Sequence, residues 1–135
     1  MKQLAPSILS ADFICLGEQL KQLQKLCIHY LHIDVMDGMF VPSISFGMPV
    51  IASLRKHTDM FFDVHLMIEE PIRYVNALRQ AGADGLTVHA EACADLPGTI
   101  AAIRESGAKP AVCLSPKTPL SKLDGILDQV DMEIG

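Results

Sequence analysis

The segment YLHIDVMDG, residues 30–38, carries a histidine and an aspartate two positions apart in an otherwise apolar run. Successive side chains of a β-strand point to opposite faces, so a strand here places His32 and Asp34 on the same face. The apolar residues between them then face the other side, where helices can cover them. An imidazole and a carboxylate side by side are residue types that bind divalent metals or transfer protons.

A second segment, FDVHLMI at residues 62–68, repeats this arrangement with Asp63 and His65 on one face. Neighbouring strands lie about 4.8 Å apart, so two imidazoles and a carboxylate can converge on one point. Such a group suits Zn²⁺, Fe²⁺ or Mn²⁺. One buried histidine alone is more often structural. Two matched strands favour function, because an unpaired buried carboxylate costs several kcal/mol.

The other histidines give weaker indications. His89, in the segment TVHAE, has no acidic residue two positions before it, and we interpret it as structural or as a support for a ligand. His29 and His57 flank predicted elements, where surface positions are expected. Met36 and Met67 are expected to form a polarisable floor beside the metal, although methionine at core spacing more often serves packing.

Strand-length apolar runs alternate with segments of helical spacing along the whole chain. The predicted strands are QLAPSIL, YLHIDVM, FFDVHLMI, GLTVHA, PAVCL and VDMEI. The predicted helices are LGEQLKQLQKL, PIRYVNALRQAGA, DLPGTIAAIRESGA and TPLSKLDGILDQ. Near-continuous apolar strands that alternate with helices indicate a parallel sheet covered by helices.

Two architectures fit this alternation: an open doubly wound sheet and a closed (β/α)₈ barrel. The chain has no Gly-x-Gly-x-x-Gly segment and no Walker lysine, which disfavours nucleotide binding on an open sheet. Polar residues near strand ends favour the barrel, whose active sites lie at the carboxyl ends of the strands. We therefore predict an α/β fold of the (β/α)₈ TIM-barrel type. Residues 1–135 would form a single domain, the N-terminal portion of an incomplete barrel, with about five βα units and the start of a sixth strand.

The composition of the chain disfavours some classes of binding partner and indicates a cellular compartment. The net charge is −5 and lysines and arginines do not cluster, so neither nucleic acid nor an anionic membrane surface is an expected partner. No apolar run reaches membrane-spanning length and no signal peptide is evident, so we expect a cytoplasmic protein. The cysteines are far apart and are expected to be reduced, buried small hydrophobes: Cys15, Cys27, Cys93 and Cys113.

Five segments in this order carry a family resemblance: APSILSADF, HIDVMDGMFVP, DVHLMIEEP, AGADGLTVHAEA and LSPKTPL. Together they resemble the ribulose-phosphate 3-epimerase family, from about Leu4 to Asp131. The resemblance implies a (β/α)₈ barrel with a divalent metal at its carboxyl-end mouth. It also implies interconversion of D-ribulose 5-phosphate and D-xylulose 5-phosphate in the pentose phosphate pathway, with a ketose phosphate as the substrate.

The resemblance also assigns residue roles. His32, Asp34 and His65 would be the metal ligands, and the metal would be Zn, Fe or Mn. Ser7 and His65 would contact the substrate. Asp34 would also be the catalytic residue, as one of two acid/base carboxylates. This assignment agrees with the chemistry, because epimerisation beside a ketone removes a proton from one face and returns one on the other.

The sequence departs from the family pattern at several points. Met39 stands where histidine is usual, and Ser43 where asparagine is common. The family continues beyond this chain's last residue with a Gly-rich phosphate loop and a second catalytic aspartate. We therefore expect weak metal binding, no appreciable turnover by this chain alone, and homo-oligomers or self-association through open sheet edges.

Three further alternatives stay open from the sequence. The substrate could be another ketose phosphate such as allulose 6-phosphate. The chain could be a truncated, non-catalytic metal-binding fragment. A decarboxylase or aldol-type relative on the same barrel is less favoured. Such enzymes show an Asp-x-Lys pattern, and the segment HIDVMD has no lysine.

Overall fold

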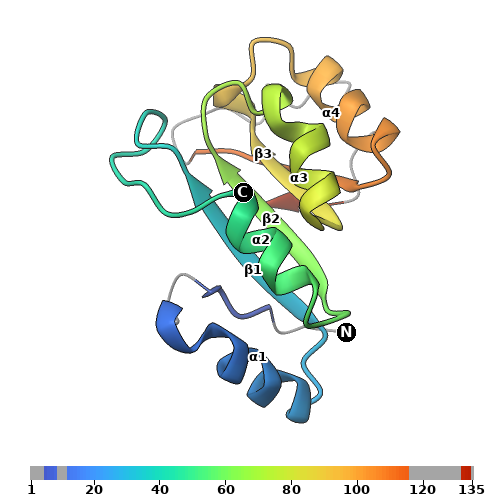
Figure 1. The fold of residues 1–135 in the computed structure, drawn as a ribbon. Coiled ribbons are helices and arrows are strands. Elements are labelled where there is room, and N and C mark those ends of the chain that lie inside the picture. Colours follow the sequence, from blue (N-terminus) through green and yellow to red (C-terminus); the bar gives the residue numbers. More distant parts are fainter. Residues whose placement is uncertain (1–4, 9–11, 116–131, 135) are drawn as a thin grey trace.

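A parallel sheet is the centre of the molecule. The computed structural model describes residues 5–8, 12–115 and 132–134. In these residues five strands pair in the order β1-β2-β3-β4-β5 (Figure 1). The strands are β1 (Tyr30–Met36), β2 (Phe61–Met67), β3 (Gly85–His89), β4 (Lys109–Cys113) and β5 (Met132–Ile134). Each strand lies beside the next one in the chain, which is the strand order of a (β/α)₈ barrel.

Helix α1 (Leu16–Lys25) precedes β1, and the successive strands from β1 to β4 are connected by α2 (Met48–Arg55), α3 (Val75–Ala81) and α4 (Leu96–Glu105). Short 3₁₀ turns cover Phe13–Cys15, Pro71–Tyr74 and Ala90–Ala92. In Figure 1 α2 and α3 lie side by side over the sheet, with α4 beyond them. In the described part of the chain, no helix has the length and apolar character to cross a membrane.

The alternation predicted for β1 and β2 is confirmed. Both strands show a strict pattern of buried and half-buried residues. Ile33 and Val64 are completely buried on the helix-covered face. The half-buried face carries the polar residues, and the pairing register sets His32 opposite Asp63 and Asp34 opposite His65.

Several elements differ from the sequence-based expectation. Of the predicted strand QLAPSIL, residues 5–8 are described, and they form a parallel bridge between Ser7 and His32. Helix α2 was not among the predicted helices, although Gly47 and Pro49 stand at its start, where they suit a helix N-terminus. The predicted helix at 118–129 lies outside the described residues.

The end of α1 differs from the prediction. The helix stops at Lys25, one residue before the end of the predicted segment LGEQLKQLQKL, and Leu26 is 71% exposed. Cys27 is also exposed and has a left-handed backbone, with φ of 58°. The prediction of a buried cysteine is therefore wrong for Cys27, because the chain turns away from the core there. Cys113 is buried as expected.

A cluster of charged residues lies at the amino ends of the strands and connects them by hydrogen bonds. Arg55, at the end of α2, donates to Asp84 Oδ2 at 2.8 Å, and its guanidinium lies 3.9 Å from the centre of the Phe62 ring. It also donates to backbone carbonyl groups, those of Thr58, Met60 and Gly82. Asp84 Oδ2 in turn accepts a hydrogen bond from the Phe62 amide at 2.8 Å. The cluster connects α2 to the starts of β2 and β3.

Candidate active site

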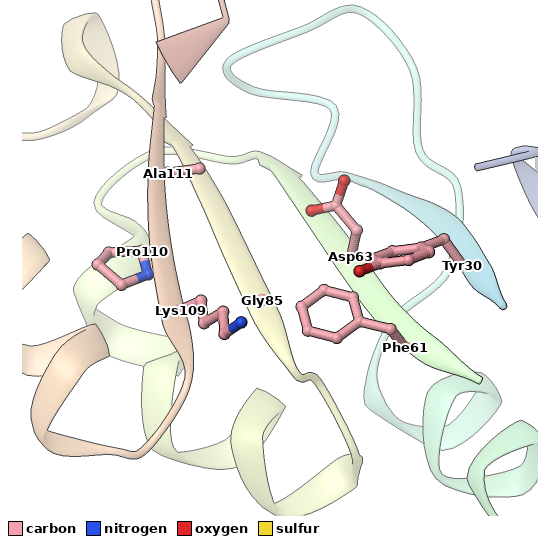
Figure 2. Close-up of a pocket in the computed structure, with 7 residues that line it drawn as sticks. All are labelled: Tyr30, Phe61, Asp63, Gly85, Lys109, Pro110 and Ala111. Carbon is pink, nitrogen blue, oxygen red and sulfur yellow. The ribbon is translucent and has the colours of Figure 1, made fainter. Parts of the chain in front are cut away.

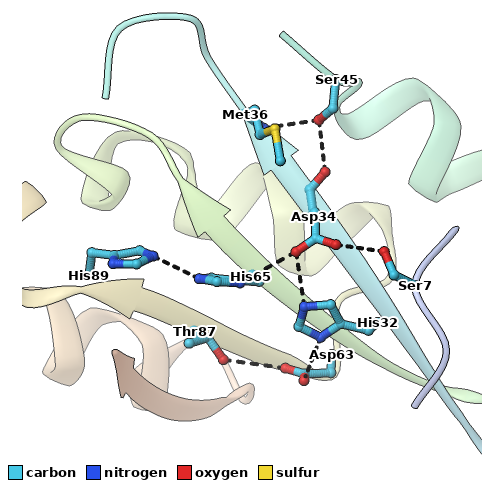
Figure 3. Close-up of polar contacts among 9 residues, drawn as sticks. All are labelled: Ser7, His32, Asp34, Met36, Ser45, Asp63, His65, Thr87 and His89. Carbon is cyan, nitrogen blue, oxygen red and sulfur yellow. Dashed lines mark hydrogen bonds and ion pairs between the residues drawn. The ribbon is translucent and has the colours of Figure 1, made fainter. Parts of the chain in front are cut away.

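Asp34 is the centre of a polar cluster near the carboxyl end of β1. Its Oδ1 atom lies 3.0 Å from His32 Nε2 and 3.4 Å from His65 Nδ1 (Figure 3). Ser7 Oγ donates to Asp34 Oδ2 at 2.6 Å. The strand register produces this convergence, because Asp34 pairs with His65 and the Ser7 bridge lies on the other side of β1. The structure thus brings together the four residues to which the resemblance assigned roles.

Asp63 holds the other side of the His32 ring. His32 Nδ1 lies 3.1 Å from Asp63 Oδ2, and Thr87 Oγ1 donates to Asp63 Oδ1 at 3.3 Å. A carboxylate on one imidazole nitrogen fixes the ring and directs the other nitrogen to its target. The sequence placed Asp63 on the correct face but gave it no role. A role for Asp63 could have been inferred from its position opposite His32, because paired residues of neighbouring strands lie close together.

The cluster has an unusual charge state. Hydrogen bonds to Asp34 and then to Asp63 raise the pKa of His32 to about 10, against the opposing effect of burial. Burial alone would raise the pKa of Asp34, but hydrogen bonds with His32, His65 and Ser7 outweigh it and hold that pKa well below the usual range. In the absence of any ion, His32 is therefore a cation that lies between two acidic side chains.

His89 extends the cluster onto β3. Its Nε2 atom lies 2.8 Å from His65 Nε2, and the two rings stack with centroids 4.9 Å apart. One of the two nitrogens must donate and the other accept. Burial and then the nearby His65 lower the pKa of His89, against the effect of Glu91. Its contact with His65 agrees with the interpretation of His89 as a support for a ligand.

The loop after β1 is fixed over the site by two polar residues. Ser45 Oγ donates to the Asp34 carbonyl at 2.7 Å and accepts from the Met36 amide at 3.0 Å. The Asp37 carboxylate accepts backbone hydrogen bonds at 2.8–2.9 Å from Met39, Phe40 and Glu69. The Phe40 ring lies 5.1 Å from the His89 ring. Sequence reasoning missed Ser45, because nothing in the local pattern shows that its hydroxyl returns to β1.

The donor set fits a divalent metal ion. One ligand atom each from His32, Asp34 and His65 lie within 4.8 Å of one another. Two imidazoles and a carboxylate match the preferences of Zn²⁺, Fe²⁺ and Mn²⁺. The carboxylates of Asp34 and Asp63 lie on either side of the His32 ring, so this position also favours positive charge.

A hollow of about 170 Å³ lies on the same face, toward the amino ends of the strands, and adjoins the cluster at Asp63 (Figure 2). Its lining includes the first residue of each of the strands β1 to β4: Tyr30, Phe61, Gly85 and Lys109. Tyr30 and Phe61 pack with ring centroids 5.0 Å apart, and Lys109 Nζ lies 5.8 Å from the centre of the Phe61 ring. Barrel chemistry occurs at the carboxyl ends of strands, so we assign this hollow to the inner packing layer.

Comparison with solved structures supports the barrel fold. The structure resembles the tryptophan synthase α subunit from Legionella pneumophila, with a TM-score of 0.66, 17% identity and coverage of 99% of this chain and 62% of that chain. A mutant α subunit from Pyrococcus furiosus gives a TM-score of 0.67 at 15% identity, over 95% of this chain and 62% of that chain. At these identities the likeness concerns the fold alone. The fold is therefore that of an incomplete (β/α)₈ barrel, as predicted.

Comparison of sequences gives the family. The model of the ribulose-phosphate 3 epimerase family matches residues 3–134. The ribulose-phosphate 3-epimerase of Bacillus subtilis is 50% identical over 98% of this chain and 61% of its own length. That of Rhodobacter capsulatus is 44% identical over 96% of this chain and 57% of its own length. The chain thus spans about three fifths of the length of these relatives. It belongs to the ribulose-phosphate 3-epimerase family.

Proposed function

We propose that this chain carries the metal-binding part of an epimerase site that interconverts D-ribulose 5-phosphate and D-xylulose 5-phosphate in the pentose phosphate pathway. The observation that carries the proposal is the position of the Asp34 carboxylate, where His32, His65 and Ser7 converge. Family membership and the names of the relatives support the reaction class.

In this proposal Asp34 is the group that moves the proton. Epimerisation at a carbon beside a ketone begins with removal of its proton, and a carboxylate within reach can accept it. The hydrogen bonds that lower the pKa of Asp34 keep it in the ionised form that a general base needs, and the same hydrogen bonds weaken it as a base. Return of a proton on the opposite face requires an acid other than Asp34.

His32, Asp34 and His65 would hold the divalent metal, which we expect to be Zn, Fe or Mn. When bound, the metal would supply Lewis-acid stabilisation of negative charge on the substrate oxygens. Asp63 would keep the His32 ring in the orientation that ligation needs. Ser7 and His65 are the proposed substrate contacts, since both side chains lie beside Asp34.

Two further expectations belong to this proposal. The sequence predicts a cytoplasmic protein and self-association through the sheet edges. Sedimentation velocity of the purified chain measures the second expectation directly. A single monomeric species over a wide concentration range would contradict it.

Exchange of the substrate's carbon-3 hydrogen with solvent tests the proposal. Exchange needs removal and return of a proton on one face only, so a single base is sufficient. We expect the metal-loaded chain in deuterium oxide to incorporate deuterium at carbon 3 of ribulose 5-phosphate, as followed by NMR. Asp34→Asn should reduce this rate by about 100-fold, while Asp59→Asn, an exposed control, should leave it unchanged.

The same samples distinguish the alternatives. Net formation of xylulose 5-phosphate also needs an acid on the opposite face of the substrate, so we expect it to be at least ~10-fold slower than carbon-3 exchange in the same sample. Faster exchange with allulose 6-phosphate would assign a different ketose phosphate. If the metal-loaded chain gives no exchange above background with either sugar, the proposed reaction is wrong. The chain would then be a non-catalytic metal-binding protein.

A further inference from the structure

We propose that His65, His89 and Cys113 form a second ion site, selective for a thiophilic metal ion, and that an ion held there withdraws His65 from the first site. The existence of this site does not depend on the proposed function. Its consequence, competition with the metal of the first site, does rest on that function.

The three residues lie at or near the carboxyl ends of adjacent strands. His65 is on β2, His89 is the last residue of β3, and Cys113 is the last residue of β4. The register of β3 and β4 pairs His89 directly with Cys113. One ligand atom from each of the three residues lies within 4.8 Å of the other two. The strand pairing therefore assembles three donors without help from any loop.

The two sites differ in chemistry although they share an imidazole. The first set contains a carboxylate, whereas the second contains the sulfur of Cys113, which is only 8% exposed. Thiolate with imidazole suits Zn²⁺, Cu⁺ and similar soft ions, and a thiolate is a poor ligand for Mn²⁺ or Mg²⁺. Zn²⁺ suits both sets, but Mn²⁺ should prefer the first set, whereas Cu⁺ and Cd²⁺ should prefer the second.

His89 has a buried nitrogen beside a carboxylate, on the side of the ring away from His65. In the described residues, the Nδ1 atom of His89 is buried and makes no hydrogen bond. Its Nε2 atom makes the contact with His65. With an ion on Nε2 the proton of the ring would reside on Nδ1, which lies 3.9 Å from Glu91 Oε2. A carboxylate behind a ligating histidine is a common arrangement in metal sites.

The orientation of His65 makes the two sites compete. Its Nδ1 atom lies toward Asp34 and its Nε2 atom toward His89. A neutral imidazole offers one lone pair, because the other nitrogen carries the proton. His65 can therefore serve one of the two ions at a time, and a thiophilic ion in the second set leaves the first with two ligands.

Titration of the purified chain with Cd²⁺ tests the site, because thiolate–cadmium bonds give a charge-transfer absorption in the near ultraviolet. We expect a saturating band in the parent chain and a ¹¹³Cd resonance in the range of thiolate ligation. Cys113→Ser should abolish the band, and His89→Gln should weaken Cd²⁺ binding by about tenfold. Bound Cd²⁺ should also weaken Mn²⁺ binding to the first set.

Two controls separate the outcomes. Cys93→Ser should keep the band, since Cys93 is a partly buried thiol that contacts His89 only through the backbone carbonyl. Asp34→Asn should also keep the band, which makes this test independent of the first site and of the epimerase proposal. Absence of the band and of the thiolate resonance in the parent chain, or an undiminished band in Cys113→Ser, would overturn the second site. An unchanged Mn²⁺ affinity with Cd²⁺ bound would overturn the competition.

Discussion

Two polar clusters lie at opposite ends of the same strands, and they differ in what their charges can do. At the amino ends, the cation of Arg55 is held by Asp84, by three backbone carbonyl groups and by the face of Phe62. At the carboxyl ends, the Asp34 cluster consists mainly of groups that can gain or lose a proton. Arg55 is always charged, whereas the charge of His32 can be exchanged for that of a metal ion.

This difference in charge indicates that the Arg55 cluster stabilises the fold and that the Asp34 cluster binds ions. The partners of Arg55 are largely backbone atoms that define where α2 meets β2 and β3, so its removal should act on stability. Asp34 and Asp63 both contact His32, so substitution of either aspartate should change the affinity of the site for a metal ion. Barrels commonly divide in this way, with stability at the amino-end face and chemistry at the carboxyl-end face.

The largest expected effect is on stability, from Arg55→Met. The change removes the guanidinium from Asp84 and from three backbone carbonyl groups, and we expect a loss of about 3 kcal/mol in the free energy of unfolding. Urea denaturation measures it. Lys21→Met, at an exposed lysine of α1, is the control and should change stability little. If Arg55→Met weakened Mn²⁺ binding without destabilising the fold, the proposed division between the two ends would be wrong.

Gly82→Ala should also destabilise the amino-end cluster, by about 2 kcal/mol. Gly82 has φ of +131°, and an added Cβ would lie 2.4 Å from Arg55 Cδ. Gly17→Ala is a matched control, because nothing lies within 4 Å of a Cβ there and Gly17 is inside helix α1. That substitution should stabilise the chain by about 0.5–1 kcal/mol. Equal thermal shifts for both variants would contradict the role assigned to Gly82.

Asp63→Asn tests the carboxyl-end cluster through a residue that is not a proposed ligand. Loss of the charge behind His32 should weaken Mn²⁺ binding by about tenfold, which is about 1.4 kcal/mol. Isothermal titration calorimetry measures the affinity, and Asp59→Asn is the exposed control. A variant with the parent's affinity would show that Asp63 does not orient His32.

The smallest effect is expected from Asp37, which fixes the loop over the site. Burial would raise the pKa of Asp37, but backbone hydrogen bonds from Glu69, Met39 and Phe40 outweigh it and lower that pKa. Because the folded-state pKa is the lower one, the stabilisation is present above the unfolded value of about 4 and is lost as the pH falls through the folded value. The stability difference between the parent chain and Asp37→Asn should therefore shrink on acidification. A difference that grows instead would contradict the assigned hydrogen bonds.

Local periodicity made much of this molecule predictable from its sequence. The two-residue alternation of β1 and β2 is a property of the strand itself, so it placed His32 and Asp34 on one face before any contact was known. The repetition of the pattern at Asp63 and His65 then predicted the strand pairing that the structure contains. The roles of these residues in metal and substrate binding stay predictions.

What the sequence did not predict depends on contacts between distant segments. The contact of His89 with His65 and the position of Cys113 follow from the register of β2, β3 and β4, which no local pattern encodes. Cys27 is exposed because it lies just beyond the end of α1. The residue type of Cys27 does not show where the helix ends, so the sequence did not predict this exposure. Helix α2 was missed because its short apolar segment, MPVIASLR, resembles a strand as much as a helix.

The central claim, that His32, Asp34 and His65 form a divalent metal site, is tested most directly by titration with Mn²⁺. Mn²⁺ is the appropriate probe because a thiolate-containing site binds it poorly. We predict that calorimetry will detect one weak site in the parent chain and in Asp59→Ala, and that Asp34→Ala, with an unchanged circular dichroism spectrum, will bind about 100-fold more weakly. If Asp34→Ala binds Mn²⁺ as well as the parent chain does, the site assignment is wrong.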